Sequence, residues 1–151
     1  MSFLFDLLEG VAIEERLLAK IKEKYPSATL INAYKGYDIW IPETSQGIEV
    51  KYDPMSNETG NIVVEIEMSG KKSALTTTTA DYWVFYDNHE YAWFKPMDIV
   101  YCIFVNKLKC VDFVGNGDKN AKRAFLVPKE ILFAHAIKRV KDEYVPKQQN
   151  S

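Results

Sequence analysis

The alternation of apolar and polar residues is clearest between positions 37 and 51, where it predicts two antiparallel strands. Pro42 and Gly47 bracket four polar or small residues, 43–46, as is typical of a hairpin loop. We expect a symmetric hairpin with Pro42 opposite Gly47. This register pairs Ile41 with Ile48, Ile39 with Val50, Trp40 with Glu49 and Asp38 with Lys51.

The two faces of this predicted hairpin differ in character, because side chains alternate faces along a strand. One face is wholly aliphatic: Ile39, Ile41, Ile48 and Val50. The other face gathers Asp38, Glu49 and Lys51. A slip of one residue would place two aliphatic side chains beside the charges, so we expect the apolar pattern itself to fix this register. A metal ion would explain two carboxylates and an ammonium on one patch of sheet.

A second interpretation of the charged face is that its side chains simply face water, as on many half-exposed strands. Two features favour a site. Aspartate is disfavoured inside strands, so Asp38 in the middle of one indicates a function. Trp40 shares the same face, and a tryptophan fits a covered surface better than a solvated one.

Residues 3–24 are predicted to form an amphipathic helix that ends before Pro26. Glu14 lies inside its apolar stripe, and Glu15 lies nearer the edge of that stripe. The stripe consists of Leu4, Leu7, Leu8, Val11, Leu18 and Ile21. An inward carboxylate is costly unless it is paired or bound to a metal, although Glu14 at a stripe edge could also reach water.

Downstream of the hairpin, residues 62–67 are predicted to form a third strand with Glu65 on its polar face. Glu65 either joins the charged patch or lies at a solvated edge. A short helix is expected within 69–81, followed by a strongly β-prone strand over 82–86. Polar residues before that strand would suit phosphate contacts, or would form a solvated helix face; the candidates are Lys71, Lys72, Ser73 and Thr77.

The rest of the chain predicts a return strand over 91–94, a helix over 96–104, strands over 107–114 and 124–127, and a last helix over 128–140. We therefore predict an α/β (α+β) fold with a central mixed β-sheet flanked by helices. The chain of 151 residues is expected to form one domain, 1–145, with a flexible tail, 146–151.

Composition narrows the function classes. A net charge of −2 argues against a protein that coats nucleic acid nonspecifically, since phosphate binding depends on Lys and Arg. Cys102 and Cys110 are the two cysteines, and their spacing to each other and to histidines does not resemble a zinc site. Without a signal sequence or an apolar run of about 18 residues, the protein is expected to be soluble and cytoplasmic, with no membrane partner.

Asp38, ten intervening residues and then Glu49-Val50-Lys51 resemble the motif of the PD-(D/E)XK nuclease superfamily. The resemblance covers residues 10 to 87, and Tyr37 stands where the usual proline would be. The later run from Ser69-Gly70 to Ala-Asp-Tyr-Trp-Val-Phe-Tyr at 80–86 looks like a segment of Holliday junction resolvase-like and restriction endonuclease-like proteins.

The resemblance implies a restriction endonuclease-like core of order αβββαβ and a metal-dependent endonuclease that hydrolyses phosphodiester bonds in DNA, including branched or junction DNA. It implies that Asp38, Glu49 and the Val50 carbonyl bind Mg²⁺ or Mn²⁺. Lys51 would act on the attacking water or on the phosphate, and Glu14 would ligate a second metal or a metal-bound water. It also implies a homodimer. The alternative is an inactive nucleic-acid-binding or interaction domain of the same fold.

Overall fold

A computed structural model describes residues 3–31, 36–114 and 121–143 of the chain. The predicted tail, 146–151, lies outside the described residues. The helices are α1 (Phe3–Lys24), α2 (Ser56–Thr59), the 3₁₀ helix η1 (Ala74–Thr76), α3 (Pro96–Val105) and α4 (Lys129–Ala134). Among these described helices, we find none with the length and apolar character that a membrane crossing requires.

The strands form two sheets. The first sheet has the order β1-β2-β3-β6-β7-β10, and the second has the order β5-β4-β9-β8. Strand bounds in the first sheet are β1 (Thr29–Leu30), β2 (Ile39–Ile41), β3 (Gln46–Tyr52), β6 (Tyr82–Tyr86), β7 (Glu90–Phe94) and β10 (Lys138–Lys141). Those in the second are β4 (Asn61–Met68), β5 (Lys71–Lys72), β8 (Cys110–Phe113) and β9 (Lys122–Pro128).

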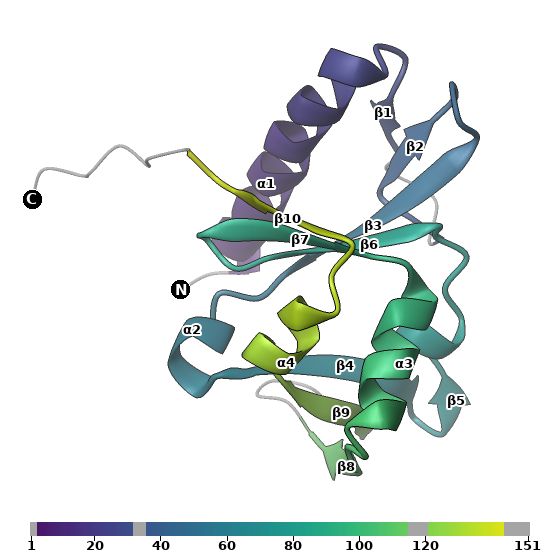
Figure 1. The fold of residues 1–151 in the computed structure, drawn as a ribbon, viewed down its shortest axis with the longest axis vertical. Coiled ribbons are helices and arrows are strands. Elements are labelled where there is room, and N and C mark those ends of the chain that lie inside the picture. Colours follow the sequence, from purple (N-terminus) through teal and green to yellow (C-terminus); the bar gives the residue numbers. More distant parts are fainter. Residues whose placement is uncertain (1–2, 32–35, 115–120, 144–151) are drawn as a thin grey trace, which may run out of the picture.

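The first sheet is mixed, because β3 and β6 are parallel while its other neighbouring strands are antiparallel. Helix α1 covers one of its faces, and the second sheet, with α3 and α4, lies on the other (Figure 1). The expected mixed α/β architecture, with helices packed on a mixed sheet, is therefore present. The parallel pairing joins segments that are 34 residues apart, Ile48 to Tyr82, and the chain between them forms α2, β4, β5 and η1.

Two apolar cores follow from this layering. The first joins α1 to the first sheet through its inward row of Ile13, Leu17 and Ile21. The predicted stripe was rotated: Leu8 and Val11 are exposed. The second core lies between the sheets and contains Ile62, Val64, Trp83, Phe85, Phe94, Ile99, Cys102, Val127, Leu132 and Phe133. Burial of these side chains at about 25 cal/mol per Å² is what holds the layers together.

The hairpin of β2 and β3 forms, but the predicted register was wrong by two residues. Ile39 pairs with Ile48 and Trp40 pairs with Gly47, and residues 42–45 alone make the turn. Ser45, the last of them, has a φ of 53°, which tightens the turn. A shift of two keeps every side chain on its predicted face, since the strand period is two. Ile39, Ile41 and Ile48 are accordingly all buried against α1.

Three other element predictions need correction. The strand predicted at 62–67 is β4, which belongs to the second sheet and pairs with β9. Instead of a helix of two turns, 69–81 contains β5 and η1, because Ser73 and Thr76 bond to each other's backbone and close a single 3₁₀ turn. The last helix ends at Ala134, and 138–141 form edge strand β10 against β7.

A part-buried ion pair links the end of β6 to the start of α4. Asp87, which follows β6, accepts a hydrogen bond of 2.6 Å from Lys129 Nζ at the start of α4. Burial raises the pKa of Asp87, but hydrogen bonds from Lys129, His89 and Glu90 outweigh it, so that this pKa lies below its usual value. Asn57 of α2 also accepts a hydrogen bond from Lys129, which ties α2 to the same junction.

Candidate active site

Asp38 and Glu49 lie side by side at the end of the hairpin. Asp38 directly precedes β2, and its N–H donates to the Ile48 carbonyl over 2.8 Å. In the register of β2 and β3 the Asp38 N–H would bond to Glu49, so this bond to Ile48 marks the point where the regular ladder ends. The charge of Asp38 acts on Glu49, so the two carboxylates lie close to each other. Asp38 was expected in the middle of a strand; the structure places it at the strand's end, where an aspartate is better tolerated.

The Asp38 carboxylate also closes an open strand edge. Strand β3 runs on past β2, so its edge from Val50 onward has no β2 partner. The Val50 N–H donates to Asp38 Oδ2 over 2.7 Å. Because the N–H and C=O of one residue point to the same edge of a strand, the Val50 carbonyl is directed to the edge where Asp38 lies. A backbone oxygen and a carboxylate therefore share this edge.

Lys51 completes the predicted set. Its Nζ lies 3.4 Å from Glu49 Oε1 and 5.1 Å from the centre of the Trp83 ring. Residues 49 and 51 share one face of β3, and in the parallel register they stand beside Trp83 and Phe85 of β6. The structure thus brings Asp38, Glu49 and Lys51 together, as the hairpin pattern predicts.

Glu14 reaches the same group from α1. It lies between the buried row of Ile13 and Leu17 and the half-buried Leu18, and it is itself half-buried. Burial, and then the negative charges of Asp38 and Glu49, raise the pKa of Glu14 to about 7. The inward glutamate of the sequence pattern therefore belongs to the carboxylate cluster of Glu14, Asp38 and Glu49.

The two strand carboxylates also titrate above their ordinary range. Burial raises the pKa of Asp38, and the Val50 N–H and the Lys51 ammonium offset only part of this effect. Burial and the neighbouring Asp38 raise the pKa of Glu49, against the opposing effect of Lys51. One lysine does not balance three carboxylates, so the carboxylate cluster has an excess of negative charge that an added cation would neutralise.

The two weaker candidates lie elsewhere. Glu15 is exposed on α1. Glu65 is on β4 in the second sheet, where it accepts a hydrogen bond of 2.6 Å from Ser73 Oγ and lies 3.4 Å from Lys122 Nζ. The structure therefore gives Glu65 partners of its own and does not bring it to the carboxylate cluster.

The predicted phosphate-binding residues flank the second sheet. Lys71 and Lys72 are exposed on β5, which pairs with the end of β4. Ser73 is engaged by Glu65, and the Thr77 hydroxyl donates to the Ala74 carbonyl at 3.4 Å. The two lysines are thus open to a partner, whereas Ser73 and Thr77 have structural roles in the turn.

Trp83 and its neighbours are supporting residues that the sequence pattern did not identify. The Trp83 ring lies under Lys51, and its Nε1 donates to Thr78 Oγ1 over 2.9 Å, which fixes the indole. Tyr37 stacks on Trp40 and lies directly over Gly47, where a Cβ atom would approach its ring to 2.5 Å. Trp83 lies opposite Glu49 because β6 pairs in parallel with β3. The sequence predicts β6 as a strand, but its local pattern does not show that this strand pairs with β3.

No three His, Cys, Asp or Glu side chains within the described ranges converge closely enough to form a ready-made metal site. The oxygen donors that do share the hairpin's end are the Asp38 and Glu49 carboxylates, the Val50 carbonyl edge and Glu14 nearby. This donor set fits Mg²⁺ or Mn²⁺, because such hard cations take oxygen ligands from one or two carboxylates and keep several waters.

Comparison of the chain with protein-family models, with curated proteins and with solved structures found no match.

Proposed function

We propose that this protein is a metal-dependent endonuclease that hydrolyses phosphodiester bonds in DNA. The observation that supports the proposal best is the convergence of Asp38 and Glu49 beside Lys51, with Glu14 near enough to share their charge. A cluster of part-buried carboxylates is unfavourable by itself, and cation binding offsets that cost.

Asp38, Glu49 and the Val50 carbonyl would hold Mg²⁺ or Mn²⁺. When bound, such a cation supplies a more acidic water and neutralises charge on the phosphate. Lys51 would donate hydrogen bonds to the attacking water or to the phosphate oxygens, where negative charge increases in the transition state. Glu14, with a pKa of about 7, can accept or release a proton near neutral pH and would hold a water at the edge of the site.

The restriction endonuclease-like core is part of this proposal. Along the chain, α1, β2, β3, β4, η1 and β6 occur in the order of helix, three strands, helix and strand that the resemblance implies, with β1, α2 and β5 between them. Strand β6 is parallel to β3, and β4 departs into the second sheet. Free Cys102 and Cys110 are compatible with a reducing cytoplasm, where we place the protein.

We also propose that two copies associate through α3. Five apolar side chains at helical spacing are exposed along this helix: Met97, Val100, Tyr101, Phe104 and Val105. From Ile99 to its end, the helix has no charged residue. Because this apolar stripe carries no charge, its best partner is another apolar surface. The same stripe on a second copy is such a surface when two α3 helices pack antiparallel about a twofold axis. A dimer would enlarge the surface available to DNA.

One specific observation favours the alternative, an inactive nucleic-acid-binding or interaction domain of the same fold. Asp38 caps the open edge of β3 through Val50, and Lys51 is paired with Glu49. Each of these residues therefore has a structural use that would retain it without catalysis.

A cleavage assay distinguishes the two functions. Chelator-treated protein is incubated with Mn²⁺ and labelled linear, nicked and four-way DNA. We expect cation-dependent cleavage by the wild type, and a loss of about a hundredfold or more in Asp38→Asn and in Lys51→Ala, because general acid–base and metal-assisted steps typically contribute about 10²–10⁴.

Glu15→Gln is the matched control, since Glu15 is exposed and follows Glu14 in the chain. This variant should cleave DNA as the wild type does. Circular dichroism checks that each variant is folded. Full cleavage by folded Asp38→Asn or Lys51→Ala would refute the assignment, and DNA binding without any cleavage would establish the inactive alternative.

A further inference from the structure

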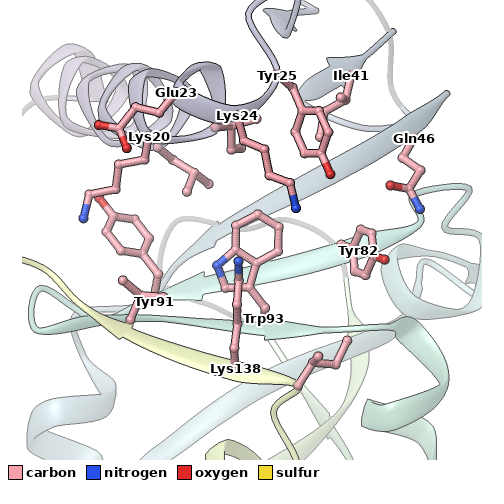
Figure 2. A pocket seen from close by; sticks show the side chains of 14 residues that line it. Lys20, Glu23, Lys24, Tyr25, Ile41, Gln46, Tyr82, Tyr91, Trp93 and Lys138 are labelled. Atoms are coloured by element: carbon pink, nitrogen blue, oxygen red, sulfur yellow. The ribbon is translucent and has the colours of Figure 1, made fainter. Parts of the chain in front are cut away.

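A pocket of about 540 Å³ opens between the C-terminal half of α1 and the first sheet (Figure 2). Its volume lies within the range of small-molecule sites, about 300–1,000 Å³. Buried side chains make the floor: Leu17, Ile21, Ile41 and Tyr91. None of Glu14, Asp38, Glu49 and Lys51 lines it, so this pocket is separate from the candidate active site.

Aromatic rings form the walls of the pocket. Tyr25, Tyr82 and Trp93 are each partly exposed, and Figure 2 shows them around one opening. The Tyr82 and Trp93 rings meet edge to face, with centres 6.1 Å apart and planes at 67°. Accessible aromatic faces of this kind are where unpaired nucleobases stack. The Gln46 amide at the same rim offers both a donor and an acceptor for a base edge.

Three lysines surround these rings. The ammonium of Lys138 lies 4.4 Å from the centre of Trp93, that of Lys24 lies 5.3 Å from Tyr25, and that of Lys20 lies 5.6 Å from Tyr91. In the part of the chain that the structure describes, none of these lysines forms an ion pair with a carboxylate.

Glu23 is the one carboxylate among the described lining residues, so the rim is positive in a protein whose net charge is −2. Aromatic walls with a cationic rim are complementary to a ligand that is itself both aromatic and anionic. A neutral aromatic ligand would leave the lysines unused, and a bare phosphate would leave the rings unused.

We propose that this pocket binds a nucleotide, with the base stacked on Trp93 and Tyr82 and the phosphate held by Lys24 and Lys138. A base on Trp93 takes the place that the Lys138 ammonium occupies, and Lys138 is then free to bind the phosphate at the rim. The nucleotide is either a free mononucleotide or one unit of a single strand. The site does not depend on the hydrolytic activity proposed above, because it shares no residue with it.

Calorimetric titration in EDTA tests the site without cleavage. The probes are deoxyadenosine monophosphate, deoxyadenosine, deoxyribose 5-phosphate and a short oligothymidylate. We expect the monophosphate to bind at least tenfold more tightly than either of its halves, with an affinity that falls as salt rises. Tighter binding of the oligothymidylate than of the mononucleotide assigns the site to a strand, and equal or weaker binding assigns it to a free nucleotide.

Two double variants provide the comparison. Lys24→Gln with Lys138→Gln should weaken monophosphate binding at least tenfold. Lys22→Gln with Lys141→Gln removes the same charge from the same helix and strand but from residues outside the pocket, and should bind as the wild type does. Thermal unfolding confirms that both are folded. Absence of monophosphate binding by the wild type, equal binding of deoxyribose 5-phosphate, or an equal loss in both double variants would overturn the proposal.

Discussion

At the scale of single residues, the sequence identifies the charged side chains of the site but not what holds them. Asp38, Glu49 and Lys51 were predictable because period-two alternation places them on one face. The hydrogen bond from Val50 N–H to Asp38 and the contact of Lys51 with Trp83 were not predictable. The first contact depends on where β2 ends, and the second depends on which distant strand lies beside β3. The local pattern of residues predicts neither of these features.

The Glu14 carboxyl gives a prediction for the protein without metal. Its pKa is about 7 in the fold and about 4.5 when unfolded. The stability that this raised pKa contributes is fully present below pH 4.5 and is lost as the pH rises through 7. Glu14→Gln removes the titration, so it should be stabilised relative to the wild type at pH 8 by about 1–2 kcal/mol, after allowance for solvent screening of a half-exposed group.

Urea unfolding in EDTA at pH 5 and pH 8 measures this difference, with Glu15→Gln as the control. The wild type and Glu15→Gln should lose stability between the two pH values, and Glu14→Gln should lose less. Parallel losses in all three proteins would show that the pKa of Glu14 is not raised in the fold.

At the scale of elements, strong periodicity was a good guide and polar segments were not. Helix α1 and the strands β2, β3 and β6 follow directly from apolar spacing. Strand β10, Lys-Arg-Val-Lys, was mistaken for the end of a helix because it has no apolar alternation. Tertiary contacts hold it in place: Arg139 bonds to both carboxylate oxygens of Glu90, and Lys138 lies over Trp93.

Helix α3 provides the element-scale prediction. Phe104 is the most exposed side chain of the apolar stripe on α3, at 78%, so Phe104→Glu should disrupt a dimer without harming the fold. We expect wild-type protein at micromolar concentration to sediment as two chains and Phe104→Glu to sediment as one. The free energy of unfolding of the isolated chain should change by no more than about 0.5 kcal/mol, as for other surface substitutions.

Leu8→Glu is the control for this experiment, since Leu8 is 59% exposed but lies on α1, away from the apolar stripe of α3. It should sediment as the wild type does. A wild type that is monomeric throughout, or dissociation of both variants alike, would exclude α3 as the interface.

At the scale of the whole molecule, the division of the strands into two sheets was the feature that could not be predicted from the sequence. Residues 62–67 read as a continuation of the hairpin sheet, yet β4 pairs with β9, and Ile62 lies opposite Val127. A pairing over that separation depends on closing a long loop, which no local pattern encodes. The carboxylates of the hairpin were nevertheless predictable, because α1, β2 and β3 are consecutive in the chain, whereas the parallel pairing of β3 with β6 that makes the sheet mixed is not local.

The central claim is that the carboxylates at the end of the hairpin bind a divalent cation, and calorimetric titration of chelator-treated protein with Mn²⁺ tests it most directly. We predict that the wild type binds Mn²⁺ and that Asp38→Asn and Glu49→Gln each bind at least tenfold more weakly, about 1.4 kcal/mol. The control Glu65→Gln, altered in the second sheet, should be unchanged. Failure of the wild type to bind Mn²⁺, or undiminished affinity in Asp38→Asn and Glu49→Gln, would contradict the claim.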